Sequence, residues 1–118
     1  MPPETQRQRR LAQLHRDYEQ LRSELDQLGY ILQGSLTARR IPCGKAACAC
    51  TTDIAARHGP YFQWSRKRAG RTVSTYLTPE QAALCQQWIK NNRRLEHTVS
   101  KMRKLSLRLA RLYDMPTI

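Results

Sequence analysis

Apolar residues recur at helical spacing in the first third of the chain, and the residues between them are polar. They are three or four positions apart: Leu11, Leu14, Tyr18, Leu21, Leu25, Leu28 and Leu32. This spacing predicts an amphipathic helix with a coiled-coil seam over residues 11–33. Gly34 follows the last seam residue, where a helix commonly ends in a left-handed turn. Residues 1–10 lack an apolar run and are predicted to be a flexible basic N-terminus.

A second helix is predicted over residues 78–113. Thr78 offers an N-cap, Pro79 suits the first helical position, and Gln81 can complete a capping box. An apolar stripe then runs towards Pro116 through Leu84, Trp88, Leu95, Val99, Met102, Leu109 and Leu112. Leu105 and Ser106 compete for one position of the stripe. Asn91 and Asn92 interrupt it, either as buried residues that fix the register or as a solvated bend.

The segment 34–77 between these helices is predicted to form a small β unit. Aromatic and β-branched residues favour strands over 61–65 and 72–77, joined by a turn over 66–71 that contains Gly70. Residues 36–41 offer a third strand. The fold class is therefore mainly α with a small β unit.

The two helices are expected to form an antiparallel coiled-coil hairpin around this unit, with all of 1–118 in a single domain. A parallel homodimer through the first helix competes with the intramolecular hairpin.

Three cysteines lie close together in the β unit. Cys43, Cys48 and Cys50 fall within eight residues, and His58 follows. In a reduced compartment such clusters bind metal more often than they form disulfides, so we expect a structural zinc held by these four residues. The spacing C-x4-C-x-C-x7-H differs from the common C-x2-C pair, which leaves unligated thiols and iron–sulfur chemistry as alternatives. Cys85 competes with His58 for the fourth position, although a buried apolar role suits it better.

These motifs, together with the segment His58-Gly59-Pro60-Tyr61 and the residues that follow, resemble a bacterial family catalogued as a domain of unknown function (number 6788). The resemblance covers about residues 30–113. It implies a zinc-binding knuckle that leads into a β-hairpin, and it favours His58 over Cys85 as a ligand. Members are often encoded near transposases, which implies an association with a mobile element.

The chain carries 21 Lys and Arg against 9 Asp and Glu, a net charge of +12. Residues 1–33 are neutral, so the whole excess lies in the last two thirds, where a polyanionic partner is indicated. No segment reads as a secretory signal or a membrane span, so we expect a cytoplasmic protein without membrane contact, associated with the nucleoid if it binds DNA.

Two basic surfaces are expected: the second helix, and the hairpin tip with nearby aromatic residues that suit base stacking. Asp17 of the first helix is not expected to reach the outward basic stripe of the second. The candidate nucleic-acid-binding residues are Arg39, Arg40, Lys45, Arg66, Lys67, Arg68, Arg71, Arg94, Lys101, Lys104, Arg108 and Arg111.

The first functional hypothesis is a nucleic-acid-binding accessory protein, with DNA favoured over RNA. The alternative is a coiled-coil module that recruits a partner, such as a recombinase or transposase, without touching nucleic acid. No catalytic constellation is recognisable: the basic segment contains a single acidic residue, Asp53, and no nucleophile–base pair. The chain is therefore not expected to be an enzyme.

Overall fold

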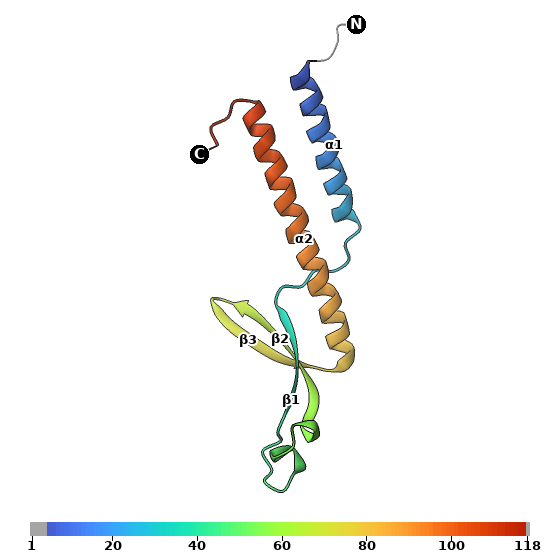
Figure 1. Cartoon of the computed structure of the whole chain (residues 1–118), viewed down its shortest axis with the longest axis vertical. Helices are drawn as coiled ribbons and strands as arrows, with labels where there is room; N and C mark the ends of the chain where they lie inside the picture. The colour runs from blue at the N-terminus through green and yellow to red at the C-terminus, as the bar shows by residue number, and fades with distance from the viewer. Residues whose placement is uncertain (1–4, 118) are drawn as a thin grey trace. The chain divides into compact units, whose positions relative to one another are not determined.

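The computed structural model describes residues 5–117, which form two long helices and a three-stranded sheet (Figure 1). The elements are α1 (Gln6–Asp26), β1 (Ser35–Ile41), η1 (Ala49–Thr51), η2 (Ile54–Ala56), β2 (His58–Arg68), β3 (Arg71–Leu77) and α2 (Pro79–Leu112), where η marks a short 3₁₀ helix. The predicted fold class, mainly α with a small β unit, is confirmed. The chain divides into two compact units: one joins the residues up to Tyr30 with those from Asn91 onward, and the other is Ile31–Lys90.

Helix α1 begins earlier than predicted because Thr5 caps it. The Thr5 hydroxyl accepts a hydrogen bond from the Gln8 amide at 3.1 Å, and the Gln8 side chain accepts one from the Thr5 amide at 2.8 Å. This reciprocal pair satisfies backbone N–H groups that have no partner within a first helical turn. Residues 6–10 of the predicted flexible N-terminus are therefore helical, and residues 1–4 lie outside the described residues.

Helix α1 also ends at Asp26 rather than at residue 33, so the prediction that the seam stays helical to Leu32 is wrong. Gly29 follows the helix end closely, and glycine disfavours helix because it loses more backbone entropy than other residues. The backbone beyond it finds other partners: the Leu32 amide donates to the Trp88 carbonyl at 3.1 Å.

In the first unit α1 and the second half of α2 run in opposite directions. The Arg7 guanidinium donates to the Leu112 carbonyl at 3.0 Å and lies 5.2 Å from the centroid of the Tyr113 ring. At the other end the Asn91 side chain donates to the Tyr30 carbonyl at 2.8 Å. The coiled-coil packing itself stays a prediction.

The inward side of α2 in this unit contains more polar residues than predicted. Asn91, Asn92 and Thr98 are buried, and Asn92 donates to the Glu96 carboxylate at 3.1 Å. The alternative of a solvated bend is wrong, because α2 continues unbroken through both asparagines. Leu105 is half-buried and Ser106 exposed, so Leu105 takes the contested position.

The second unit contains an antiparallel sheet in the order β1-β2-β3, which confirms the third strand. The turn between β2 and β3 is shorter than predicted: it consists of Ala69 and Gly70, whose φ angles of 51° and 78° are both positive. Two positive φ angles match the right-handed twist of the flanking strands in a two-residue hairpin loop. The basic residues 66–68 and Arg71 consequently lie within paired strands and not in a loop.

One face of the sheet carries the apolar side chains. Leu36, Phe62, Trp64, Val73 and Leu77 share this face in the strand register and are half-buried. The first turns of α2 supply buried apolar residues to the same unit: Ala82, Cys85 and Ile89. Capping of α2 follows the prediction, since the Thr78 hydroxyl accepts from the Gln81 amide at 3.2 Å and the Gln81 side chain from the Thr78 amide at 2.9 Å.

Gly34 has a role other than ending a helix. Its φ is +120°, and a Cβ there would clash with the Ser65 carbonyl oxygen and lie 2.6 Å from Trp64 Nε1. This close approach lets Trp64 Nε1 donate to the neighbouring Gln33 carbonyl at 2.9 Å.

Within residues 5–117, neither helix has an apolar stretch long enough to cross a membrane.

Candidate metal centre and basic surfaces

The strand register brings the first and last residues of the cysteine cluster together. The β1–β2 ladder ends with Ile41 opposite His58, after a bulge beyond Arg39. Cys43 follows Ile41 by two residues, so the segment 42–57 is a loop closed at its neck by this pair. Cys48 and Cys50 lie inside the loop, where η1 turns the chain back. The end of the ladder thus positions His58 and, two residues beyond Ile41, Cys43, while the middle of the loop carries Cys48 and Cys50.

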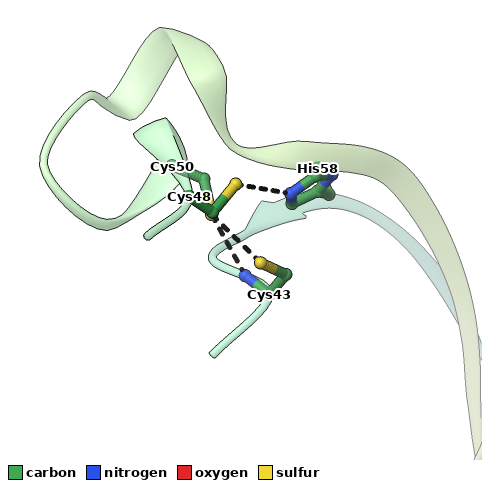
Figure 2. Close-up of side chains that lie close together, drawn as sticks. All are labelled: Cys43, Cys48, Cys50 and His58. Carbon is green, nitrogen blue, oxygen red and sulfur yellow. Dashed lines mark hydrogen bonds between the residues drawn. The ribbon is translucent and has the colours of Figure 1, made fainter. Parts of the chain in front are cut away.

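The four side chains point towards one another at the end of this loop (Figure 2). Cys48 Sγ lies 3.2 Å from His58 Nε2, and the sulfurs of Cys50 and Cys43 are 3.5 Å apart. All four potential ligand atoms lie within 4.8 Å of one another. Cys50 is buried, whereas Cys43 and His58 are exposed, so the cluster lies against the protein on one side and opens to solvent on the other.

Backbone hydrogen bonds hold the loop in shape. The Cys48 amide donates to the Lys45 carbonyl at 3.1 Å, and the Thr51 hydroxyl donates to the same carbonyl at 3.1 Å. The Asp53 carboxylate caps η2 by accepting from the Ala55 amide at 3.0 Å. The acidic residue of the basic segment therefore has a local structural role.

The cluster environment acts differently on two of the thiols. Hydrogen bonds from the Cys50 backbone, and from the thiols of Cys50 and Cys43, lower the pKa of the Cys48 thiol. The Cys43 amide, 3.3 Å from Cys50 Sγ, acts to lower the pKa of Cys50. Burial and the neighbouring thiols outweigh it, and the pKa of Cys50 is raised. A bound cation would favour the deprotonated form of these neighbouring thiols, because it attracts the thiolates and replaces their protons.

The donor set fits a zinc ion. Zinc prefers four sulfur or nitrogen ligands in a tetrahedron, and Zn–S bonds of about 2.3 Å place two sulfurs about 3.8 Å apart. The observed 3.5 Å between two of the sulfurs and 3.2 Å between sulfur and imidazole nitrogen are close to such edges. The predicted residues Cys43, Cys48, Cys50 and His58 thus form a possible metal site, consistent with zinc.

Cys85 lies elsewhere in the second unit and is not part of this cluster. It is buried in α2, and burial raises the pKa of its thiol, which Arg66 offsets only in part. It is a small buried apolar residue in the packing of the unit. His58, and not Cys85, is therefore the fourth candidate ligand.

The match to a family model covers residues 4–87 and is described as a domain of unknown function (DUF6788). The chain belongs to the DUF6788 family. The predicted extent of the resemblance needs correction: the family pattern includes α1 and stops in the first third of α2. All four cluster residues and the whole sheet of this DUF6788 domain lie inside the match, whereas the basic second half of α2 lies outside it. No curated protein and no solved structure matches the chain.

The predicted nucleic-acid-binding residues of the β unit lie in different surroundings. Arg39, Arg40, Lys45, Lys67, Arg68 and Arg71 are exposed. Arg66 is half-buried: its guanidinium lies 3.8 Å from the Trp64 ring centroid and donates to the Thr75 hydroxyl at 2.7 Å. The guanidinium of Arg66 thus makes its contacts within the sheet, whereas the other six residues are exposed.

The predicted residues of α2 are all exposed: Arg94, Lys101, Lys104, Arg108 and Arg111. Several of them border grooves shared with α1. Asp17 lines one groove with Lys101, Lys104 and Arg108, and another with Arg108 and Arg111. Asp17 thus borders the same grooves as part of the stripe, while its carboxylate accepts a hydrogen bond from the Gln13 side chain at 2.8 Å.

Sequence reasoning missed one division within the sheet. Phe62 and Trp64 belong to its half-buried face, whereas Tyr61 and Tyr76 lie on the other face and are 41% and 65% exposed. Strict alternation along β2 and β3, combined with the pairing register, is the signal that separates the two sets. The register was not available from the strand pattern alone.

Proposed function

We propose that this DUF6788 domain is a nucleic-acid-binding accessory protein that contacts the phosphate backbone of DNA through α2 and its basic hairpin. The observation that carries the proposal is the exposure of Arg94, Lys101, Lys104, Arg108 and Arg111 along one helix. Like charges three or four residues apart destabilise an isolated helix. A polyanion outside the chain would neutralise them.

We further propose that the Cys/His cluster binds a structural zinc. Four protein ligands fill a tetrahedron and leave no position for a water or substrate, which is the arrangement of structural rather than catalytic zinc sites. The ion would fix the loop 42–57 and stabilise the end of the β1–β2 ladder. A small sheet gains folding free energy from such a site, because an ion that binds only the folded loop adds its binding free energy to folding.

The experiment for DNA binding is a titration of the full chain with a fluorescent duplex at several salt concentrations. Each neutralised phosphate releases condensed counterions, so about six contacts predict a slope of log affinity against log salt near −5. A slope near zero, or no binding at physiological salt, would contradict the proposal. Competition by an RNA duplex of the same sequence tests the preference for DNA.

The second candidate function is protein recruitment by a coiled coil formed from α1 and α2. A groove of about 450 Å³ between the two helices favours it, since Leu11, Leu14, Tyr18, Leu105 and Leu109 line that groove. A helix of a recombinase or transposase, or of a second copy of the chain, has the apolar stripe that such a groove accepts. Sedimentation analysis, with and without DNA, separates the two candidates: a recruitment module would associate with protein at salt concentrations that abolish DNA binding.

A further inference from the structure

One face of the three-stranded sheet does not belong to the apolar packing of the unit. Alternation along the strands and the pairing register place these residues together on it: Ser35, Thr37, Arg39, Tyr61, Gln63, Ser65, Lys67, Thr72, Ser74 and Tyr76. We name this set the tyrosine face. Most of its members are exposed, in contrast to the half-buried face that carries Phe62 and Trp64.

Two aromatic rings lie next to each other on the tyrosine face, towards the end that carries Arg39. Tyr76 pairs with Gln63 across the β2–β3 ladder, which places it diagonally from Tyr61. Their ring centroids are 6.3 Å apart and their planes are at 71°, an edge-to-face contact. Because each ring supports the other while leaving aromatic surface open, stacking a ligand on them costs little side-chain entropy.

The charged residues of the tyrosine face, Arg39 and Lys67, are both basic. Arg39 lies directly opposite Tyr61 in the β1–β2 ladder, and Lys67 is two strand positions beyond Ser65 on the same face. The Lys67 ammonium donates to the Thr72 hydroxyl at 2.8 Å, which keeps it over the sheet. No Asp or Glu occurs in any of the three strands. The face is therefore complementary to an anionic ligand.

Small hydrogen-bonding side chains fill the space between the aromatic and basic residues. The hydroxyls of Ser65 and Ser74 share a hydrogen bond at 2.8 Å, and the Thr37 hydroxyl donates to the Gln63 carbonyl at 3.4 Å. The Gln63 side chain is free to offer both a donor and an acceptor to a base edge. Exposed aromatic rings, flanking cations and short polar groups on a small sheet are the components with which proteins hold unpaired bases.

We propose that the tyrosine face binds a single-stranded stretch of nucleic acid, with bases stacked on Tyr61 and Tyr76 and phosphates next to Arg39 and Lys67. This inference rests on the proposed function and deepens it by assigning a second site with a different ligand form. Paired bases inside a duplex present only their edges, so they cannot stack on a side chain. The basic residues of α2, with no Phe, Tyr or Trp between Arg94 and Arg111, suit contact with the phosphate backbone.

The experiment compares the full chain with the variant Tyr61→Leu/Tyr76→Leu, which keeps an apolar side chain at each position and removes the aromatic surface. Probes are a labelled 12-nucleotide single-stranded DNA, the RNA of the same sequence, and a DNA duplex. Loss of a stacked base costs about five- to a hundredfold in affinity. We expect the double variant to bind single strands at least about tenfold more weakly and the duplex unchanged. Tyr30→Leu is the matched control, because Tyr30 is 76% exposed and lies outside the sheet.

The outcomes separate the inference from the proposed function. If the parent binds the duplex and the double variant binds single strands as the parent does, the inference about the tyrosine face is wrong. The proposed role of α2 in duplex binding is then retained. Single-strand binding that depends on the two tyrosines, without duplex binding, supports the face and removes the role of α2. Photocrosslinking of a 5-bromouracil strand to the parent gives a second readout: crosslinks must map to β2 or β3, and their absence there overturns the inference. Comparison of the DNA and RNA strands identifies which of them the face prefers.

Discussion

The guanidinium of Arg66 lies 3.8 Å from the centroid of the Trp64 ring. Trp64 precedes Arg66 by two residues on β2, so both side chains belong to the half-buried face of the sheet. The guanidinium also donates to the Thr75 hydroxyl on β3 at 2.7 Å. Arg66 is thus a packing residue of the hairpin, whereas Arg68, near the turn, is exposed and lies directly opposite Arg71.

This difference predicts opposite effects for two substitutions of the same kind. Arg66→Gln removes the cation–π contact and should lower the free energy of unfolding by about 1–2 kcal/mol. Arg68→Gln removes a like-charge pair across the ladder and should leave stability unchanged or raise it by a few tenths of a kcal/mol. Urea denaturation of both variants is the measurement. Equal losses from both would contradict the packing role of Arg66.

Zinc is expected at one ion per chain, and its removal should loosen the sheet more than the helices. Cys48→Ser should abolish binding of the ion and speed amide hydrogen exchange around Ile41 and His58, while the helical circular dichroism signal largely remains. Elemental analysis and hydrogen exchange, before and after chelation, are the measurements. Cys85→Ala is the control, because Cys85 lies outside the cluster and should leave the zinc content unchanged.

The packing of α1 predicts unequal costs along its leucine seam. Leu14 is 6% exposed and Leu21 is half-buried. Leu14→Ala should therefore cost about 2–5 kcal/mol of unfolding free energy, and Leu21→Ala less. The exposed change Gln20→Ala serves as the reference. A cost below about 1 kcal/mol at Leu14 would mean that α1 is not packed on α2 in solution.

The basic row of α2 predicts a change in the salt dependence of DNA binding. Changing Lys101, Lys104 and Arg108 together to Gln should flatten the slope of log affinity against log salt by about two to three units, and weaken all duplex sequences alike. In contrast, changing Arg68 and Arg71 should reduce sequence preference more than overall affinity if the hairpin enters a groove. A triple variant that binds duplex DNA as the parent does would exclude α2 from the interface.

The hairpin turn predicts a stabilising substitution. Ala69 has a φ of 51°, a left-handed conformation that costs an alanine about 1 kcal/mol and a glycine almost nothing. Ala69→Gly should thus raise the thermal midpoint of unfolding, although the extra freedom of glycine in the unfolded chain offsets part of the gain. The matched change Gly70→Ala, at a φ of 78°, should lower it. A fall with both changes would contradict the two-residue turn.

Much of this domain follows from local sequence signals. Three features are each formed by residues that are close in the sequence: the capping box at Thr78, the strand-like runs, and the cysteine cluster with His58. They predicted where α2 begins, the three strands and the four members of the candidate metal site. Each depends on local backbone hydrogen bonding or on donor chemistry, which a single sequence displays directly.

Other features were decided only by contacts between distant segments. The end of α1 depends on Gly29 and on the Leu32 amide finding the Trp88 carbonyl, and Gly34 is needed because Trp64 and Ser65 approach it. The neighbourhood of Cys43 and His58 depends on the register that pairs Ile41 with His58. The same register separates Tyr61 and Tyr76 from Phe62 and Trp64. A sequence displays alternation along one strand, but which face is covered is a property of the strands and helix that pack around it.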